Sequence, residues 1–214
     1  MKQFDYMEKW KKLLTPQIVS YLTTIHEYKG KQHLIAERHA DVLENLVEIA
    51  KIQSTESSNK IEGIYTSDER LKKIVLDKTM PKTRNEREIA GYRDVLNTIH
   101  ENFQHIPIRD TFILQLHRDL YKFENASYGG RFKTADNIIE EEDERGNKFV
   151  RFRPLPAWET PDAIINLCTA YNEAINKGEA DSLLLIPMFI IDFLCIHPFD
   201  DGNVPSRYQQ QIAA

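Results

Sequence analysis

The chain has 214 residues, 41% of them hydrophobic and 29% charged, and a formal net charge of −5. This length suits one substantial core with an added helical element, and it is short for two equal domains. The composition is that of a soluble globular protein and excludes a largely disordered chain. The negative net charge gives no global footprint for nucleic acid or for an anionic membrane, so neither partner is expected.

The longest apolar stretch, residues 183–196, is interrupted by Pro187 and Asp192 and is shorter than the roughly 20 residues of a membrane span. We therefore expect it to form a central helix of the core. Cys168 and Cys195 form no spacing pattern for a disulfide framework or a zinc site, and both are expected to be buried, reduced thiols. The N-terminal segment contains no apolar signal region, which predicts a cytoplasmic protein.

Apolar periodicity and capping residues predict a largely helical chain. In the N-terminal half, helices are expected from Pro16 to Gly30, from Leu34 to a stop at Gly63, and over a short segment that begins at Ser67. In the remainder, helices are expected around 89–103 and over 110–120, 161–177 and 181–196.

One segment breaks the helical pattern. Between residues 129 and 154 the helical period disappears. Basic and apolar residues alternate in 131–133 and 148–153, on either side of an acidic turn at 140–146. This pattern predicts one β-hairpin.

The apolar helix leads into a run of chemically useful groups, His197-Pro198-Phe199-Asp200-Asp201-Gly202-Asn203. A histidine can accept a proton from a hydroxyl near neutral pH. A carboxylate such as Asp201 can hold Mg²⁺ by one oxygen beside a nucleotide phosphate. A Gly-Asn pair ahead of a helix leaves backbone N–H groups free to bind an anion. Together these groups predict transfer of a phosphate-containing group from a metal-bound nucleotide.

This run resembles the signature of the Fic family, His-Pro-Phe-x-Asp/Glu-Gly-Asn-Gly-Arg-x-x-Arg. The matching residues are His197, Pro198, Phe199, Asp201, Gly202 and Asn203. Family members move AMP from ATP to a Ser, Thr or Tyr hydroxyl of a target protein, and the target can be the enzyme itself. The resemblance covers about residues 34–207 and implies a mostly α fold, a helical bundle with a β-hairpin flap. It also implies ATP as the substrate, together with Mg²⁺.

The resemblance implies roles for individual residues. His197 is expected to be the general base, Asp201 the Mg²⁺ ligand and Phe199 an anchor of the loop in the core. The residues expected at the ATP phosphates are Gly202, Asn203, Val204 and Arg207. The flap is expected to hold the main chain of the target by strand addition. The flap residues expected there are Lys133, Thr134, Ala135, Phe149, Val150 and Arg151. The basic flap residues Lys133, Arg151 and Arg153 either meet an acidic target or face solvent.

A second pattern lies N-terminal to the first. Residues 58–63, Ser-Asn-Lys-Ile-Glu-Gly, resemble the Ser/Thr-x-x-x-Glu-Gly/Asn motif of an inhibitory helix in one class of the family. The resemblance implies that Ser58, Glu62 and Gly63 restrain the enzyme, whereas the same residues could simply end a helix at a glycine. Residues 1–66 are therefore predicted to form a helical region that carries the inhibitory helix, and residues 67–214 a Fic core that is short at its C-terminus.

The signature is incomplete after Asn203. The family's Gly-Arg is Val204-Pro205 here, and Tyr208 stands at the last arginine position unless one residue is deleted, which brings Arg207 there. Valine resists the positive φ that a phosphate-binding glycine often adopts, and a lost arginine removes a charge-assisted contact.

The sequence as a whole predicts a slow, Mg²⁺-dependent protein adenylyltransferase. The alternatives are a catalytically silent member that binds a partner protein, transfer of another phosphate-containing group, and reversal of the modification. The target and the oligomeric state, a homo-oligomer included, cannot be read from the sequence.

Overall fold

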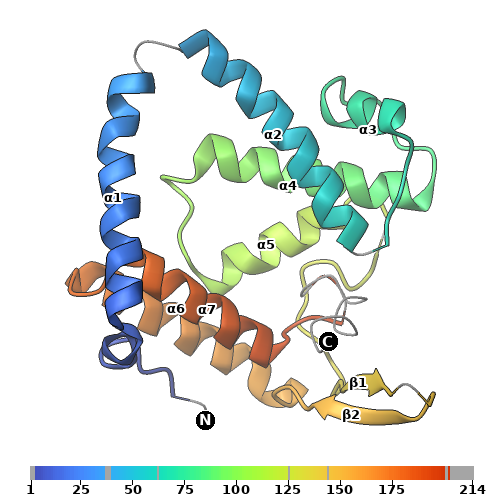
Figure 1. The fold of residues 1–214 in the computed structure, drawn as a ribbon. Helices are drawn as coiled ribbons and strands as arrows, with labels where there is room; N and C mark the ends of the chain where they lie inside the picture. Colours follow the sequence, from blue (N-terminus) through green and yellow to red (C-terminus); the bar gives the residue numbers. More distant parts are fainter. Residues whose placement is uncertain are drawn as a thin grey trace.

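The fold is given by a computed structural model (Figure 1), which describes residues 3–36, 40–61, 63–124, 126–143, 145–200 and 202. Within these residues the chain forms seven α-helices, two short 3₁₀ helices and one two-stranded sheet. The α-helices are α1 (Pro16–Ala36), α2 (Ala40–Ile61), α3 (Asp68–Val75), α4 (Arg84–Asn102), α5 (Asp110–Leu120), α6 (Thr160–Lys177) and α7 (Ser182–Ile196). The 3₁₀ helices are η1 (Lys9–Leu13) and η2 (Ala157–Glu159). The predicted mostly helical fold with one hairpin is confirmed.

The N-terminal helices differ from the prediction where the first ends and the second begins: Leu34, the predicted start of the second helix, lies in α1, and α2 begins at Ala40. Helix α1 continues through Gly30, where the sequence predicts an end. Gly30 does not adopt the positive φ of a helix-ending glycine, so it only weakens the helix, by about 1 kcal/mol relative to alanine. Helix α2 ends as predicted, because Gly63 adopts a φ of 72° and donates its N–H to the Lys60 carbonyl at 2.9 Å.

Helices α2, α3 and α4 pack on one another around a small core, and α5 packs on α4. The buried residues of this core are Leu71, Ile74, Val75, Ile89 and Ala90. Helices α4 and α5 approach each other most closely at Gly91, where an added Cβ would lie 1.8 Å from the Leu120 carbonyl oxygen. Glycine is required there because a helix backbone occupies the space that a side chain would need. This close contact fixes α5 relative to α4.

Helices α6 and α7 lie side by side and form the larger core (Figure 1). Leu185 of α7 is fully buried, but Ile190 is 49% and Ile191 61% exposed. The prediction of a central helix is therefore wrong for one face of α7, because α7 buries only the face that packs on α6 and the N-terminal segment. Among the described residues, no helix combines the length and apolar content that crossing a membrane requires.

Both cysteines lie on these two helices as free thiols, as predicted. Cys168 is buried, and burial raises the pKa of its thiol to about 11. Cys195 is half-buried, so the prediction of a buried thiol holds for Cys168 and is wrong for Cys195.

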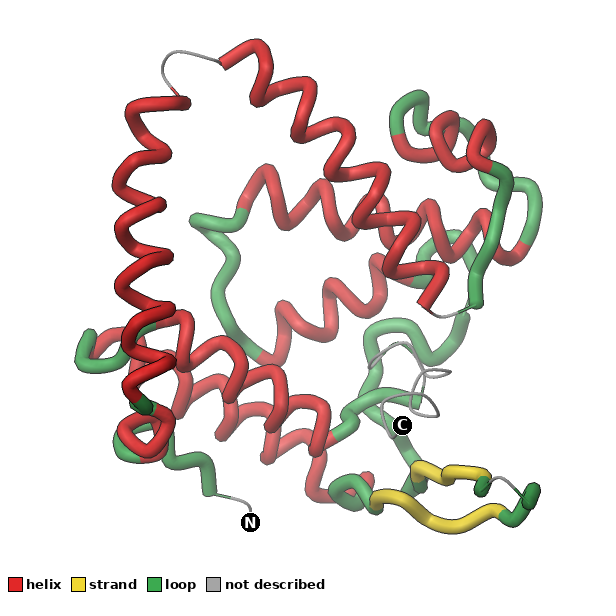
Figure 2. Tube along the Cα trace, viewed as in Figure 1, coloured by secondary structure: helices red, strands yellow, loops and turns green. Residues whose placement is uncertain are grey.

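The hairpin lies within the predicted region, but its first strand is a different segment (Figure 2). Strand β1 (Ile139–Glu142) pairs antiparallel with β2 (Lys148–Phe152). The acidic residues that the sequence places in the turn are strand residues, and Glu141 Oε2 lies 3.1 Å from Arg151 Nη1 across the ladder. Opposite charges on adjacent strands favour this pairing. Residues 131–133 lie outside the sheet and pack against the loop after α7.

Candidate active site

The predicted base, His197, is the residue that ends helix α7. Its backbone is left-handed, with φ 51° and ψ 66°, and its N–H donates to the Phe193 carbonyl at 3.0 Å. Histidine is one of the few residues besides glycine that are enriched in this conformation. The turn at His197 directs the chain away from the helix axis into Pro198 and Phe199. The position of the loop therefore depends on how α7 ends.

The surroundings of the His197 imidazole favour its neutral form. Burial lowers its pKa below the ordinary 6.5, and the nearby Lys133 ammonium lowers it further. Its Nδ1 atom is buried and has no hydrogen-bond partner within the described part of the chain. A neutral imidazole keeps a lone pair and can accept a proton at pH 7. His197 is thus in the protonation state that a general base needs.

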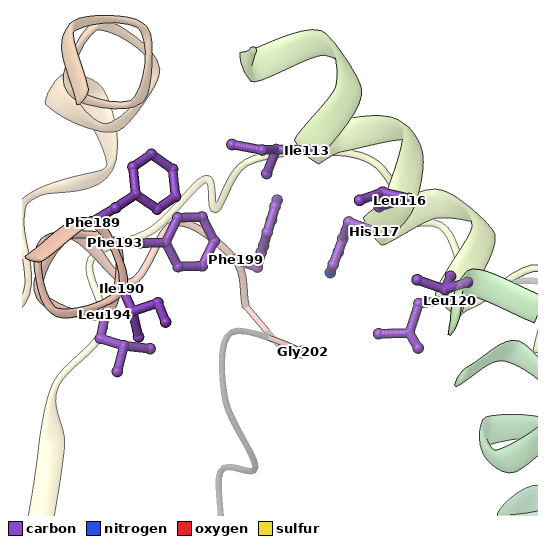
Figure 3. Close-up of a pocket in the computed structure, with 11 residues that line it drawn as sticks. Ile113, Leu116, His117, Leu120, Phe189, Ile190, Phe193, Leu194, Phe199 and Gly202 are labelled. Atoms are coloured by element: carbon purple, nitrogen blue, oxygen red, sulfur yellow. The ribbon is translucent and has the colours of Figure 1, made fainter. Parts of the chain in front are cut away.

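Phe199 anchors the loop after α7 in the protein interior, as predicted. Its side chain is 2% exposed and stacks on the His117 ring of α5, with ring centroids 3.8 Å apart and planes 4° apart (Figure 3). Phe132 and Phe193 flank it, with centroids at 6.0 and 6.3 Å. This aromatic packing ties the loop to α5 and α7 together.

Gly202 is the last residue of the loop that the structure describes, and it lies against α5 and the turn that follows it. Its φ is 74°, and an added Cβ would lie 2.9 Å from Tyr121 Oη and 3.3 Å from His117 Cδ2. Both the backbone conformation and the space therefore require glycine. Gly202 also borders an apolar cavity of about 510 Å³ between α4, α5 and α7 (Figure 3).

Lys133 has a different place from the predicted one. The sequence assigns it to the target-binding flap, but it precedes the hairpin and is 3% exposed. Its ammonium donates to the Ile196 carbonyl at 3.1 Å and to Asn137 Oδ1 at 3.0 Å. Its backbone N–H donates to the Pro198 carbonyl at 2.8 Å. A lysine buried in this way faces neither solvent nor a target, because its charge is already used inside the loop.

The other predicted flap residues are accessible. Thr134 and Ala135 are exposed in the segment before the hairpin. Phe149, Val150 and Arg151 lie exposed on β2. The opposite edge of β2 carries no further strand within the described residues.

Of the predicted inhibitory residues, Ser58 and Gly63 lie in the part of the chain that the structure describes. Ser58 Oγ lies 2.8 Å from the Tyr92 hydroxyl, so the end of α2 is held on α4. Gly63 makes the turn described above. Five predicted site residues lie outside the described residues: Glu62, Asp201, Asn203, Val204 and Arg207.

Three residues around the loop are not among the sequence candidates. His117 and Tyr121 contact Phe199 and Gly202 from α5 and its C-terminal turn, and Asn137 supports Lys133. The sequence carries a signal for His117, because His117 lies four residues after Ile113 on the apolar stripe of α5. In the structure His117 is buried there, and its Nδ1 accepts the Gly130 N–H at 2.9 Å. Asn137 has no comparable signal, because its contact is long-range.

Comparison with known proteins agrees with this geometry. A model of the Fic/DOC family matches residues 107–205, a range that includes α5, the hairpin, α6, α7 and the signature loop. No curated protein matches the sequence.

Solved structures share the fold. A Fic domain containing signaling protein from Bacteroides thetaiotaomicron is similar at TM-score 0.65 and 21% identity, covering 78% of this chain and 62% of that one. A Fic family protein from Desulfovibrio desulfuricans gives 0.68 and 21%, with 91% and 55% covered. Fic-1 from C. elegans gives 0.58 and 16%, with 95% and 61% covered. The chain thus spans little more than half the length of these proteins. Residues 107–205 therefore match the Fic/DOC family, and the chain has the helical fold of the solved Fic structures.

Proposed function

We propose that this protein is an adenylyltransferase that moves AMP from ATP to a Ser, Thr or Tyr hydroxyl of a protein. The observation that carries the proposal is a neutral, half-buried His197 at the end of α7, inside a signature loop anchored by Phe199. The family match over this loop supports the same reaction.

The proposed chemistry needs one base and one leaving group. Nε2 of His197 takes the proton of the target hydroxyl while the hydroxyl oxygen forms a bond to the α-phosphorus of ATP. The bond between the α-phosphorus and the bridging oxygen to the β-phosphate breaks. AMP remains on the target as a phosphodiester, and pyrophosphate leaves.

The nucleotide would lie at the C-terminal half of the loop. Gly202, with its positive φ, offers backbone rather than side chain to an anion. Asn203, Val204 and Arg207 follow it in the sequence, and their assignment rests on the signature. Mg²⁺ would neutralise phosphate charge, with Asp201 as the protein ligand. Phosphate oxygens and waters would complete its coordination, as is usual for Mg²⁺ beside a nucleotide.

The hairpin is the proposed site for the target. Strand β2 has a free edge among the described residues and carries exposed Phe149, Val150 and Arg151. An extended segment of a target could add to that edge through main-chain hydrogen bonds, which require no particular target sequence. Thr134 and Ala135 are exposed beside the loop and would border the same path.

The end of α2 is the proposed restraint on this activity. The hydrogen bond between Ser58 and Tyr92 of α4 holds this part of α2 in place, and Glu62 follows Ser58 by four residues in the sequence. Pairing of the Glu62 carboxylate with Arg207 would keep the outer phosphates of ATP from their positions.

Labelled ATP tests the proposed reaction. The purified protein is incubated with Mg²⁺ and ATP that carries the label at either the α- or the γ-phosphate. Label retained on protein only from the α-position supports AMP transfer. Label from the γ-position would indicate phosphoryl transfer, and no label with any tested target would favour a silent member, as the Val204-Pro205 departure allows.

A further inference from the structure

One short segment holds the backbone of the signature loop at three carbonyls, those of Ile196, Pro198 and Phe199. The Lys133 ammonium donates to the Ile196 carbonyl at 3.1 Å, and the Lys133 N–H donates to the Pro198 carbonyl at 2.8 Å. The Asn137 amide donates to the Phe199 carbonyl at 3.4 Å. One of these carbonyls belongs to the residue before His197, and the other two belong to the two residues that follow it.

The end of α7 needs such partners. The last carbonyls of a helix have no N–H donor within the helix, and they carry the negative end of its dipole. The Lys133 ammonium satisfies one of them and brings a positive charge to that end. His197 itself holds a left-handed conformation, which costs free energy and persists only where the surroundings enforce it. Lys133 and Asn137 supply that enforcement from a segment 60 residues away in the sequence.

We propose that Lys133 is a positioning residue for His197: its side chain and backbone hold the loop so that the imidazole meets the target hydroxyl. The inference rests on the proposed function in that His197 is the base. It assigns to Lys133 a place inside the site, in contrast to the flap role that the sequence suggests.

The charge of Lys133 also acts on the imidazole. Lys133 lowers the pKa of His197, in addition to burial. Burial lowers the pKa of Lys133 itself, while the carboxylates of Asp136 and Asp200 oppose that change and favour the ammonium. With the ammonium present, His197 stays neutral at lower pH than it otherwise would. Replacing Lys133 by an uncharged residue should therefore raise the pKa of His197.

Two substitutions at position 133 separate charge from bulk. Lys133→Met keeps an unbranched side chain of similar length but removes the charge and both side-chain hydrogen bonds. Lys133→Arg keeps a positive donor. The pKa of His197 is measured by NMR of the imidazole, and kcat and KM of AMP transfer are measured against pH.

We expect Lys133→Met to raise the pKa of His197, to move the acidic limb of the kcat profile to higher pH, and to lower kcat by about 10- to 100-fold, the effect of a misplaced catalytic group. KM for ATP should change much less. Lys133→Arg should keep the low pKa and remain within about threefold of the parent kcat.

The inference is overturned if His197 titrates at the same pH in Lys133→Met as in the parent. If Lys133→Met does not fold, Asn137→Ala takes its place: it should leave the pKa of His197 unchanged and lower kcat by about 2- to 13-fold, the loss of one neutral hydrogen bond. Parent kcat in that variant would overturn the inference equally. The NMR measurement needs no activity, so a failure of the proposed reaction is distinguishable from a failure of this assignment.

Discussion

Replacing Gly202 by alanine should disable the loop while leaving the rest of the protein folded. The left-handed conformation at φ 74° costs alanine about 1–2 kcal/mol. The new Cβ would also lie 2.9 Å from Tyr121 Oη and 3.1 Å from Tyr121 Cε2. The Tyr121 ring packs edge-on against His117 and Tyr128, with centroids at 5.2 and 5.0 Å, so it cannot yield without disturbing them.

The two costs together are about 2–5 kcal/mol, which corresponds to roughly 30- to 5,000-fold in an equilibrium constant. The loop lies at the surface end of α7 and can shift locally, so the cost should be seen as a loss of kcat/KM for ATP. The melting temperature should fall by little. Label transfer from α-labelled ATP and thermal unfolding, measured on the same preparation, check both halves of this expectation.

Gly178→Ala is the matched control. Gly178 also has a positive φ, 67°, but an added Cβ there would meet no atom within 4 Å. It should lose about 1–2 kcal/mol of stability and keep the parent transfer rate. Adding Tyr121→Phe to Gly202→Ala should restore part of the activity, because it removes the closest contact. A Gly202→Ala protein with the parent kcat/KM would refute the reasoning, because the loop would then not need this conformation.

Three further expectations concern stability and restraint. Gly91→Ala should lower the melting temperature by several degrees, because its Cβ would lie 1.8 Å from the Leu120 carbonyl oxygen and overpacking costs about 1–3 kcal/mol; Gly30→Ala, where nothing lies within 4 Å, should not lower it. The hydrogen-bonded Arg70 guanidinium lowers the pKa of Glu86 from 4.5 to about 2, so its stabilising contribution is present above pH 4.5 and is lost as the pH falls toward 2. Thermal unfolding against pH should show this loss in the parent and less of it in Glu86→Gln. Glu62→Gly should raise the rate of AMP transfer if α2 restrains the site, and an unchanged rate would make residues 58–63 purely structural.

The sequence predicts best where local chemistry decides the structure. Helix α5 has the predicted bounds, 110–120, because its apolar stripe and the residues at its two ends predict the same start and end. Gly63 ends α2 as predicted, since no other residue adopts its φ as easily. Gly30 shows the limit of this reasoning: the same residue type lies inside a helix that continues on either side.

Long-range contacts explain what the sequence could not predict. Lys133 lies in a segment of alternating basic and apolar residues, a pattern typical of a strand. Two of its hydrogen bonds nevertheless go to carbonyls more than 60 residues later in the chain. The first strand of the hairpin is acidic because it faces the basic β2, and composition alone suggests a turn. One face of α7 is exposed although its composition is apolar throughout, because burial depends on which elements pack against it.

The central claim is that His197 is the base for AMP transfer, and His197→Asn tests it most directly. Asparagine tolerates the left-handed conformation at φ 51° and cannot act as a base, so the variant keeps the loop and removes the chemistry. The measurement is the rate of label transfer to protein from α-labelled ATP with Mg²⁺. We predict a loss of about 10²- to 10⁴-fold with the melting temperature unchanged. Equal rates for the parent and His197→Asn would contradict the account.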